Sequence, residues 1–165
     1  MHKLIVRNRD GANETMNMIG EQFTVLAAGE ETGSYEVFIQ VVPPGAGPPL
    51  HSHPWDEAFY VLEGELVFST DKQDMHAPVR TFVHFPADSP HRFASRGGTA
   101  TIVSFTSHPG AAAFFRESNR ISSEYPGDLE KFMAVPGRHE VRMLEGPEDF
   151  IARMKSVAAV GVDGS

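Results

Sequence analysis

Two histidines and a glutamate stand close together in a short stretch of this sequence that is rich in glycine and proline. His51 and His53 are separated by one residue, and Glu57 follows four positions after His53. In an extended strand, residues i and i+2 point to the same side, so both imidazoles can reach one ion. Pro54 interrupts the strand, and the turn it forces can bring Glu57 to the same point. This set of ligands suits iron, manganese, nickel, copper or zinc.

Two glycines frame these residues. The pattern Gly-x5-His-x-His-x3-Glu-x6-Gly is met at every position from Gly45 to Gly64. It resembles the first signature motif of the cupin superfamily, whose glycines lie at turns that flank a metal-bearing pair of strands. The resemblance implies an all-β fold, the cupin double-stranded β-helix or jelly-roll barrel.

The resemblance also predicts a second motif downstream, Gly-x5-Pro-x-Gly-x2-His-x3-Asn, which supplies a fourth ligand. The stretch from Arg80 to Ser95 matches this spacing, but it keeps only Pro86 and His91. Asp88 stands where the second glycine is expected, and aspartate tolerates the left-handed turn conformation better than most residues. The resemblance therefore implies four metal ligands: His51, His53, Glu57 and His91.

A metal held in this way could support several reactions. With Glu57 ionised and the histidines neutral, a divalent ion keeps about one unit of positive charge, which attracts an anionic oxygen of a substrate. Four protein ligands on an octahedral ion leave two positions, which is room for a bidentate substrate or for a substrate and dioxygen. Glu57 could also be the catalytic base that deprotonates a substrate hydroxyl. Oxygenation of an enol, isomerisation and hydrolysis all remain open at this point.

The period of a strand indicates which residues line the substrate pocket. If Glu57 points inward, Phe59 and Val61 share its face, and Phe93 lies on the same face as His91. An apolar pocket with one charged metal favours a flat aromatic or hydrophobic ligand over a phosphorylated sugar. The same side chains would also suit the packed core of any barrel.

A narrower resemblance comes from the segments 43–53, 57–65 and 110–117. They are similar to small bacterial cupins grouped with quercetin 2,3-dioxygenase, which implies a metal-dependent dioxygenase acting on a flavonol-like or other enol-type small molecule. A noncatalytic small-molecule-binding cupin and a metal-dependent isomerase are the alternatives. Cupin barrels usually pair through an edge sheet, so the resemblance also implies a homodimer, and outward-facing Tyr60 and Leu62 are compatible with one.

The composition bounds these interpretations. A chain of 165 residues predicts one domain with a substantial core. A formal net charge of −8 argues against binding to nucleic acid or to an acidic membrane surface. The absence of cysteine excludes disulfides and thiolate metal sites. No apolar stretch has the length of a signal-peptide core or a membrane span, so we expect a soluble, cytoplasmic protein.

The remaining pattern predicts a lead-in over residues 1–21, a barrel over 22–107 and a helical tail over 108–165 that packs on the barrel. Trp55 and Asp56 are expected at the pocket mouth or in an exposed loop. Strands are expected at 22–28, 34–42, 57–63, 65–70, 79–85, 91–95 and 99–106. Helices are expected from residue 109 and at 128–134 and 147–160.

Overall fold

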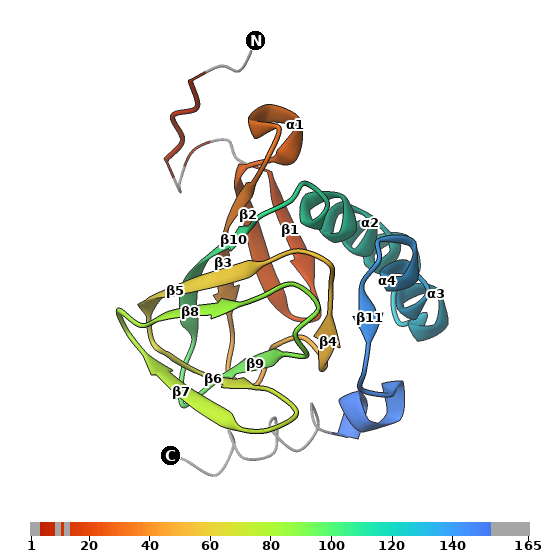
Figure 1. Cartoon of the computed structure of the whole chain (residues 1–165). Helices are drawn as coiled ribbons and strands as arrows, with labels where there is room; N and C mark the ends of the chain where they lie inside the picture. Colours follow the sequence, from red (N-terminus) through yellow and green to blue (C-terminus); the bar gives the residue numbers. More distant parts are fainter. Residues whose placement is uncertain (1–3, 9–10, 12–13, 153–165) are drawn as a thin grey trace.

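Two antiparallel sheets form the body of the protein in this computed structural model, which describes residues 4–8, 11 and 14–152 (Figure 1). The six-stranded sheet has the order β1-β2-β3-β10-β5-β8, and the three-stranded sheet has the order β7-β6-β9. The strands of the larger sheet are β1 (Thr15–Met18), β2 (Glu21–Ala27), β3 (Glu36–Val42), β5 (Glu57–Glu63), β8 (Phe82–Phe85) and β10 (Ala100–Thr106). Those of the smaller sheet are β6 (Glu65–Ser69), β7 (Asp74–Pro78) and β9 (Arg92–Ser95). This is the expected all-β jelly-roll barrel.

One core cluster fills the space between the sheets. Phe59 on β5 lies 5.1 Å from Phe68 on β6 and 5.4 Å from Phe93 on β9, measured between ring centroids. The alternation along β5 explains this arrangement, because Phe59 and Val61 are fully buried whereas Tyr60 and Leu62 face outward. The two sheets are therefore held together by the inward-facing half of each strand.

Two strands of these sheets were not expected from the sequence. β1 lies inside the expected irregular lead-in and pairs antiparallel with β2, and only Met16 and Met18 of its four residues are buried. β7 pairs with the outer edge of β6, and Ala77 is its one buried residue. A strand of four residues is too short to show a period, and an edge strand can remain polar on both faces.

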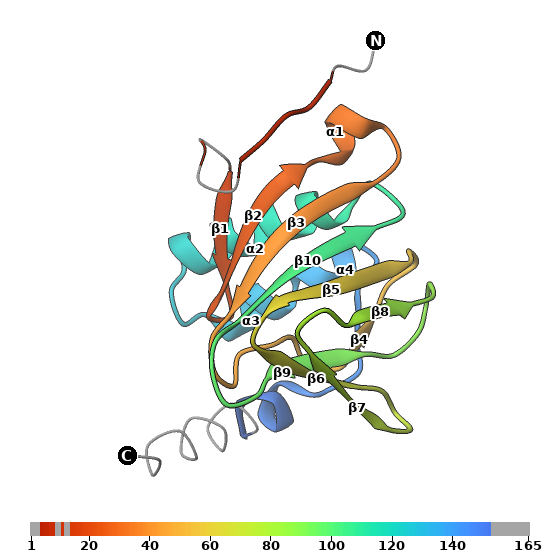
Figure 2. The same cartoon turned by 90° about the vertical axis from the view of Figure 1, so that its left-hand side faces the viewer.

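The segment after the barrel covers one end of it. The helices are α2 (Ala111–Glu124), α3 (Leu129–Met133) and α4 (Val135–Arg138), in addition to the short α1 (Gly29–Thr32) between β2 and β3. Figure 2 shows α2 behind β1 and β2, where Phe115 lies 4.4 Å from Phe23 and 5.1 Å from Phe38. These rings belong to a second core cluster, which also contains Trp55 and Val141.

The chain then returns to the barrel through a short strand, β11 (Arg142–Met143), which pairs with β4 (His51–Ser52). Residues 147–152 begin the expected third helix, and its remainder, 153–160, lies outside the described residues. None of the described helices is long and apolar enough to cross a membrane. The C-terminal segment is thus attached directly to the strand that carries the first histidine.

Close backbone packing holds the loop that leads to His51. Gly47 has a φ of +148°, and a Cβ atom at this position would lie 1.9 Å from the carbonyl oxygen of Phe93 on β9. Asp88 has a φ of +62°, which confirms that it takes the left-handed conformation expected of a glycine there. Arg80 takes it too, with a φ of +69°. Both turns of the second motif therefore keep glycine-like geometry without glycine.

Candidate metal centre

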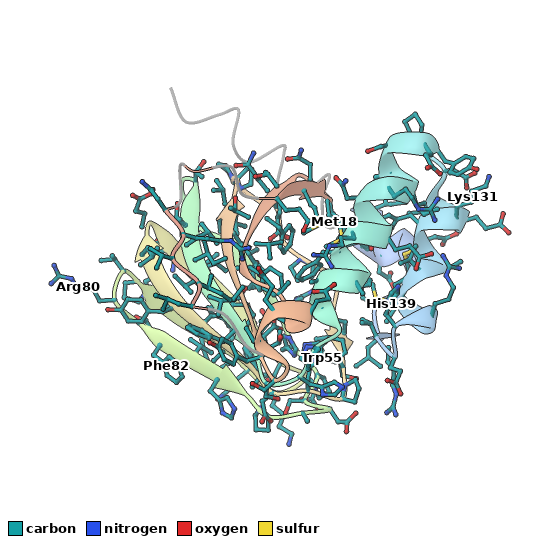
Figure 3. The ribbon with its side chains drawn as sticks, turned by 90° about the horizontal axis from the view of Figure 1, so that it is seen from above. Met18, Trp55, Arg80, Phe82, Lys131 and His139 are labelled. Carbon is teal, nitrogen blue, oxygen red and sulfur yellow. The ribbon has the colours of Figure 1, made fainter. Side chains whose placement is uncertain are left out.

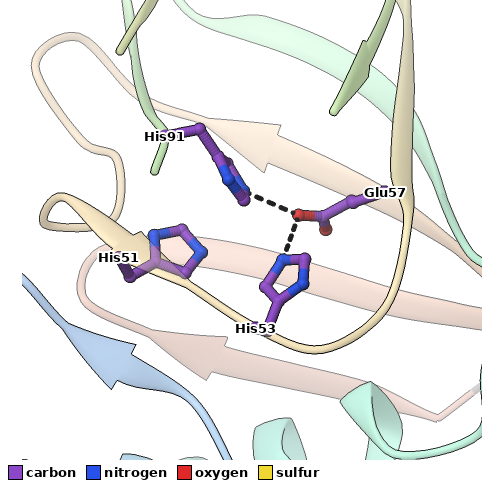
Figure 4. Close-up of side chains that lie close together, drawn as sticks. All are labelled: His51, His53, Glu57 and His91. Carbon is purple, nitrogen blue, oxygen red and sulfur yellow. Dashed lines mark hydrogen bonds and ion pairs between the residues drawn. The ribbon is translucent and has the colours of Figure 1, made fainter. Parts of the chain in front are cut away.

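Four side chains converge at the end of the barrel that the C-terminal segment covers. They are the four residues expected from the two motifs, His51, His53, Glu57 and His91, and one ligand atom of each lies within 4.8 Å of the others (Figure 4). His53, Glu57 and His91 are all less than a tenth exposed. The structure thus gathers three imidazoles and one carboxylate in a site largely shielded from water.

The backbone sets the distance between the two motifs. His51 and His91 form an antiparallel bridge in which each main-chain N–H donates to the carbonyl of the other residue, at 3.1 and 2.9 Å. The N–H of Asp88 also donates to the carbonyl of His53, at 2.8 Å. These bonds bring the fourth side chain to the other three, although the bridged histidines are 40 positions apart in the chain.

Each imidazole is oriented by a backbone carbonyl. The Nδ1 atoms of the three histidines lie 2.8 to 2.9 Å from the carbonyl oxygens of Pro49, Trp55 and Ser89. A carbonyl can only accept, so Nδ1 must carry the hydrogen, and a neutral ring then presents the lone pair of Nε2. Metal-binding histidines are typically oriented in this way.

The contacts of Glu57 also indicate a metal-binding site. Its Oε2 atom lies 3.0 Å from Nε2 of His53 and 3.1 Å from Nε2 of His91. If both rings are neutral and protonated on Nδ1, these contacts oppose lone pairs and are repulsive. They become favourable when a proton or a metal ion lies between the atoms. Three imidazole nitrogens and one carboxylate oxygen fit a divalent transition metal.

The protonation states also suit metal binding. Burial, together with the neighbouring His91, lowers the pKa of His51 to about 3, so this ring is neutral at pH 7. Burial alone would raise the pKa of Glu57, but in the metal-free protein a proton between Oε2 and Nε2 of His53 or His91 turns these contacts into hydrogen bonds, which outweigh burial and hold that pKa below its usual range. Metal ligands must be deprotonated, and both groups are.

Two aromatic rings support the histidines from outside. The Trp55 ring stacks on His53 with centroids 4.4 Å apart, and the Phe85 ring stacks on His91 at 4.5 Å. Trp55 is only 5% exposed, so the expectation of an exposed loop is wrong for this residue, which instead lines a small pocket with His51, His53 and Glu57. The turn after Pro54 folds the indole back onto the imidazole, which buries both rings.

A cavity of about 60 Å³ lies directly beside His51 and Glu57. Phe93 lines it, as expected, but Phe59 and Val61 do not, because they lie in the packed core between the sheets. A period of two identifies the inward face of a strand but not the depth along the barrel at which packing ends. The C-terminal segment supplies six further apolar residues of the wall, namely Phe114, Phe115, Phe132, Pro136, Val141 and Met143.

Two polar residues of this cavity were missed by the sequence reasoning. Glu21 and Gln40 are each 2% exposed and line the cavity from β2 and β3. Burial, reinforced by the charge of Glu57, raises the pKa of Glu21 to about 8. The signal was present in the alternation of β2, where Glu21 shares the inward face with Phe23 and Val25. A glutamate at an inward strand position is rarely structural unless it is paired.

Comparison with known proteins agrees with this geometry. Residues 38–108 match the family model of the cupin domain. The segment contains all four converging side chains. No curated protein matches the chain in sequence.

Several solved structures share the cupin fold. A predicted oxalate decarboxylase from Thermotoga maritima is 21% identical, with a TM-score of 0.54 over 64% of this chain and 99% of that one. A sugar phosphate isomerase from Silicibacter pomeroyi is 24% identical, with a TM-score of 0.52 over 60% and 73%. A structure of DMSP lyases is 20% identical, with a TM-score of 0.50 over 56% of this chain but only 50% of its own. At such identities the likeness concerns the fold alone.

Removing the fourth ligand tests the cluster. We expect His91→Ala to weaken metal binding by at least about tenfold while the barrel still folds. Loss of a residue that only orients a metal ligand already costs about this much affinity. His84→Ala is the matched control, because His84 is exposed on β8. Metal content after reconstitution and dialysis, together with circular dichroism, reports both properties. One equivalent of metal retained by the His91 variant would contradict the four-ligand site.

The buried carboxyl group of Glu21 predicts a dependence of stability on pH in the metal-free protein. The folded state binds this proton more tightly than the unfolded state, so Glu21 should lower the free energy of unfolding progressively between about pH 4.5 and pH 8. The free energy of unfolding of Glu21→Gln, measured by urea denaturation and compared with that of wild type, should therefore rise by on the order of 3 kcal/mol from pH 5 to pH 8. Glu148→Gln, a substitution at an exposed position, should show no such rise relative to wild type. Parallel curves for Glu21→Gln and wild type would refute this account.

Proposed function

We propose that this protein is a metal-dependent dioxygenase that acts on a small enol-type molecule. The observation that carries the proposal is the buried cluster of three imidazoles and one carboxylate next to an apolar cavity, since His51 and Glu57 belong to both. A bound iron, manganese, nickel or copper ion would act as a Lewis acid and would be able to react with dioxygen. The protein residues would hold that ion, place the substrate beside it and exclude water.

The cavity limits the size of the substrate. A volume of about 60 Å³ holds roughly four to six water molecules. This suits a short chain or a single ring better than the three rings of a flavonol. The walls are mainly aromatic and aliphatic, with Phe93, Phe114 and Val141 among them. We therefore favour a small, largely apolar enol over the flavonol that the narrower resemblance implies.

Glu57 serves in this proposal as a ligand rather than as the base. The surroundings that lower its pKa also make its carboxylate a weak proton acceptor. A bound ion would supply positive charge that lowers the pKa of a neighbouring enol hydroxyl group, so that the substrate would enter the site as its enolate and leave its proton in the solvent.

Oxygen uptake tests the proposal. Protein reconstituted separately with iron, manganese, nickel or copper should consume oxygen in proportion to the amount of a small enol, such as acetylacetone or allomaltol, that is added. With quercetin the oxygen uptake should be slower. The zinc-loaded protein and His91→Ala should consume none. Substrate conversion that continues without oxygen would show an isomerase instead, and binding without conversion would show a binding protein.

We also propose that the protein forms a homodimer through the outer face of the β10-β5-β8 region. Large apolar side chains gather there, although that face lies outside the core. Tyr60 pairs across the strands with Phe82, which is 64% exposed and points away from the barrel (Figure 3). Leu62 and Phe105, on neighbouring strands, are 39% and 44% exposed. A contiguous apolar patch of this kind favours a protein partner, and a second copy offers the same patch.

The oligomeric state can be tested with one substitution. Wild-type protein should elute as a dimer at micromolar concentration in size-exclusion chromatography with light scattering. Phe82→Glu should shift it to the monomer, because a charge would be buried without a partner. Leu144→Glu is the control, since Leu144 is also apolar and exposed but lies next to β11. A monomeric wild type would contradict the proposal.

A further inference from the structure

A pair of polar side chains interrupts the apolar wall of the cavity. Glu21 on β2 and Gln40 on β3 both line it. Phe23 pairs directly with Gln40 across the two strands, so Glu21 and Gln40 are diagonal neighbours on the inner face of the sheet. Side chains at such positions are close enough to contact one ligand group together.

Each of these side chains has an unpaired oxygen atom. Oε2 of Glu21 and Oε1 of Gln40 are buried and have no hydrogen-bond partner among the residues that the structure describes. The amide of Gln40 is held in place because its Nε2 donates to Oγ of Ser104, at 2.7 Å. Its carbonyl oxygen is therefore the free end. Buried polar atoms are normally paired, so two unpaired oxygens in one cavity wall point to a ligand.

The neighbouring buried carboxylate behaves differently. Glu36 on β3 is also 2% exposed, but it accepts hydrogen bonds from the backbone N–H groups of Gly29, Gly110 and Ala112 at 2.9 to 3.2 Å. Those bonds attach the start of α2 to the sheet, which is a structural role. Glu21 has no comparable bond within the described part of the chain.

We propose that Glu21 and Gln40 bind a hydroxyl group of the ligand that occupies the cavity. The carbonyl oxygen of Gln40 can only accept, so the ligand must donate to it. A hydroxyl group donates one hydrogen bond and can also accept one from a protonated carboxyl group. The ligand is thus held at two points, by an oxygen near His51 and Glu57 and by a hydroxyl group near Glu21 and Gln40, with an apolar part between them.

Burial is the main cause of the raised pKa of Glu21, about 8 in the metal-free protein, and it agrees with this assignment because it favours a carboxyl group that keeps its hydrogen. An ammonium group is the competing ligand chemistry, and it would require the ionised form of Glu21. The inference rests on the proposed function only in placing the ligand beside the metal centre, and it does not depend on reaction with oxygen.

Binding to zinc-loaded protein separates these possibilities without turnover. Kojic acid and allomaltol are hydroxypyranones with the same chelating enol, and they differ by one hydroxyl group. Isothermal titration calorimetry at pH 7 should show kojic acid binding about tenfold more tightly than allomaltol, as expected for two added hydrogen bonds. The aminomethyl analogue of kojic acid should bind no better than kojic acid.

Substitutions then assign the difference to the two side chains. Gln40→Met and Glu21→Met keep a similar shape, and each should reduce the preference for kojic acid to about twofold or less while zinc content stays at one equivalent. Gln22→Met is the matched control, because Gln22 is exposed on the same strand as Glu21, and it should keep the full preference.

Three results would overturn the inference. Equal binding of the two pyranones by wild type, or no binding of kojic acid, would show that no hydroxyl group is recognised. A preference for the aminomethyl analogue would assign the pair to a cation. A preference that survives in both methionine variants would place the recognition elsewhere. The wild-type comparison needs no variant to fold, and failure of oxygen uptake would leave it unaffected.

Discussion

The pair of main-chain hydrogen bonds between His51 and His91 is the constraint on which the site depends. Without this bridge, the motif around His51 would present two imidazoles and one carboxylate, and the other motif would present an isolated histidine. The bridge brings both together at the end of the barrel, and the close approach of Gly47 to Phe93 keeps the incoming loop against β9. Side-chain geometry at the site is therefore a consequence of strand register.

The orientation of the rings follows from the same backbone. Each Nδ1 atom faces a carbonyl oxygen two residues away in sequence, so local chain geometry selects the tautomer of every histidine. Burial disfavours charge on His51, while a proton or a cation between Glu57 and the two imidazoles beside it keeps Glu57 ionised. The cluster is consequently prepared for a cation by three neutral nitrogens and one negative oxygen.

The cavity is a joint product of the barrel and the C-terminal segment. The inner face of the sheet contributes Glu21 and Gln40, whereas the C-terminal segment contributes a large part of the apolar surface. Pairing of β11 with β4 attaches that surface to the strand that carries His51. Any change in how this segment packs would therefore alter both the size of the cavity and the surroundings of the metal ligands.

The parts of this arrangement that could be predicted are those encoded locally. His51, His53 and Glu57 follow from spacing within one strand and one turn, and most barrel strands follow from alternation. His91 required the family resemblance, because no local rule links residues so far apart in the chain. Phe59 and Val61 were misplaced because inward-facing side chains can belong either to the core or to the cavity. The roles of Glu21, Gln40 and the C-terminal wall depend on tertiary packing, which periodicity does not report.

The central claim is that three histidines with hydrogen on Nδ1 present Nε2 to one cation shared with Glu57. Long-range ¹H–¹⁵N correlation spectra of the zinc-loaded protein test this most directly, because they distinguish the two ring nitrogens of each histidine. We predict that three imidazoles, assigned to His51, His53 and His91, bind zinc through Nε2 and keep hydrogen on Nδ1. Hydrogen on Nε2 of any of these rings in the zinc-loaded protein would contradict it.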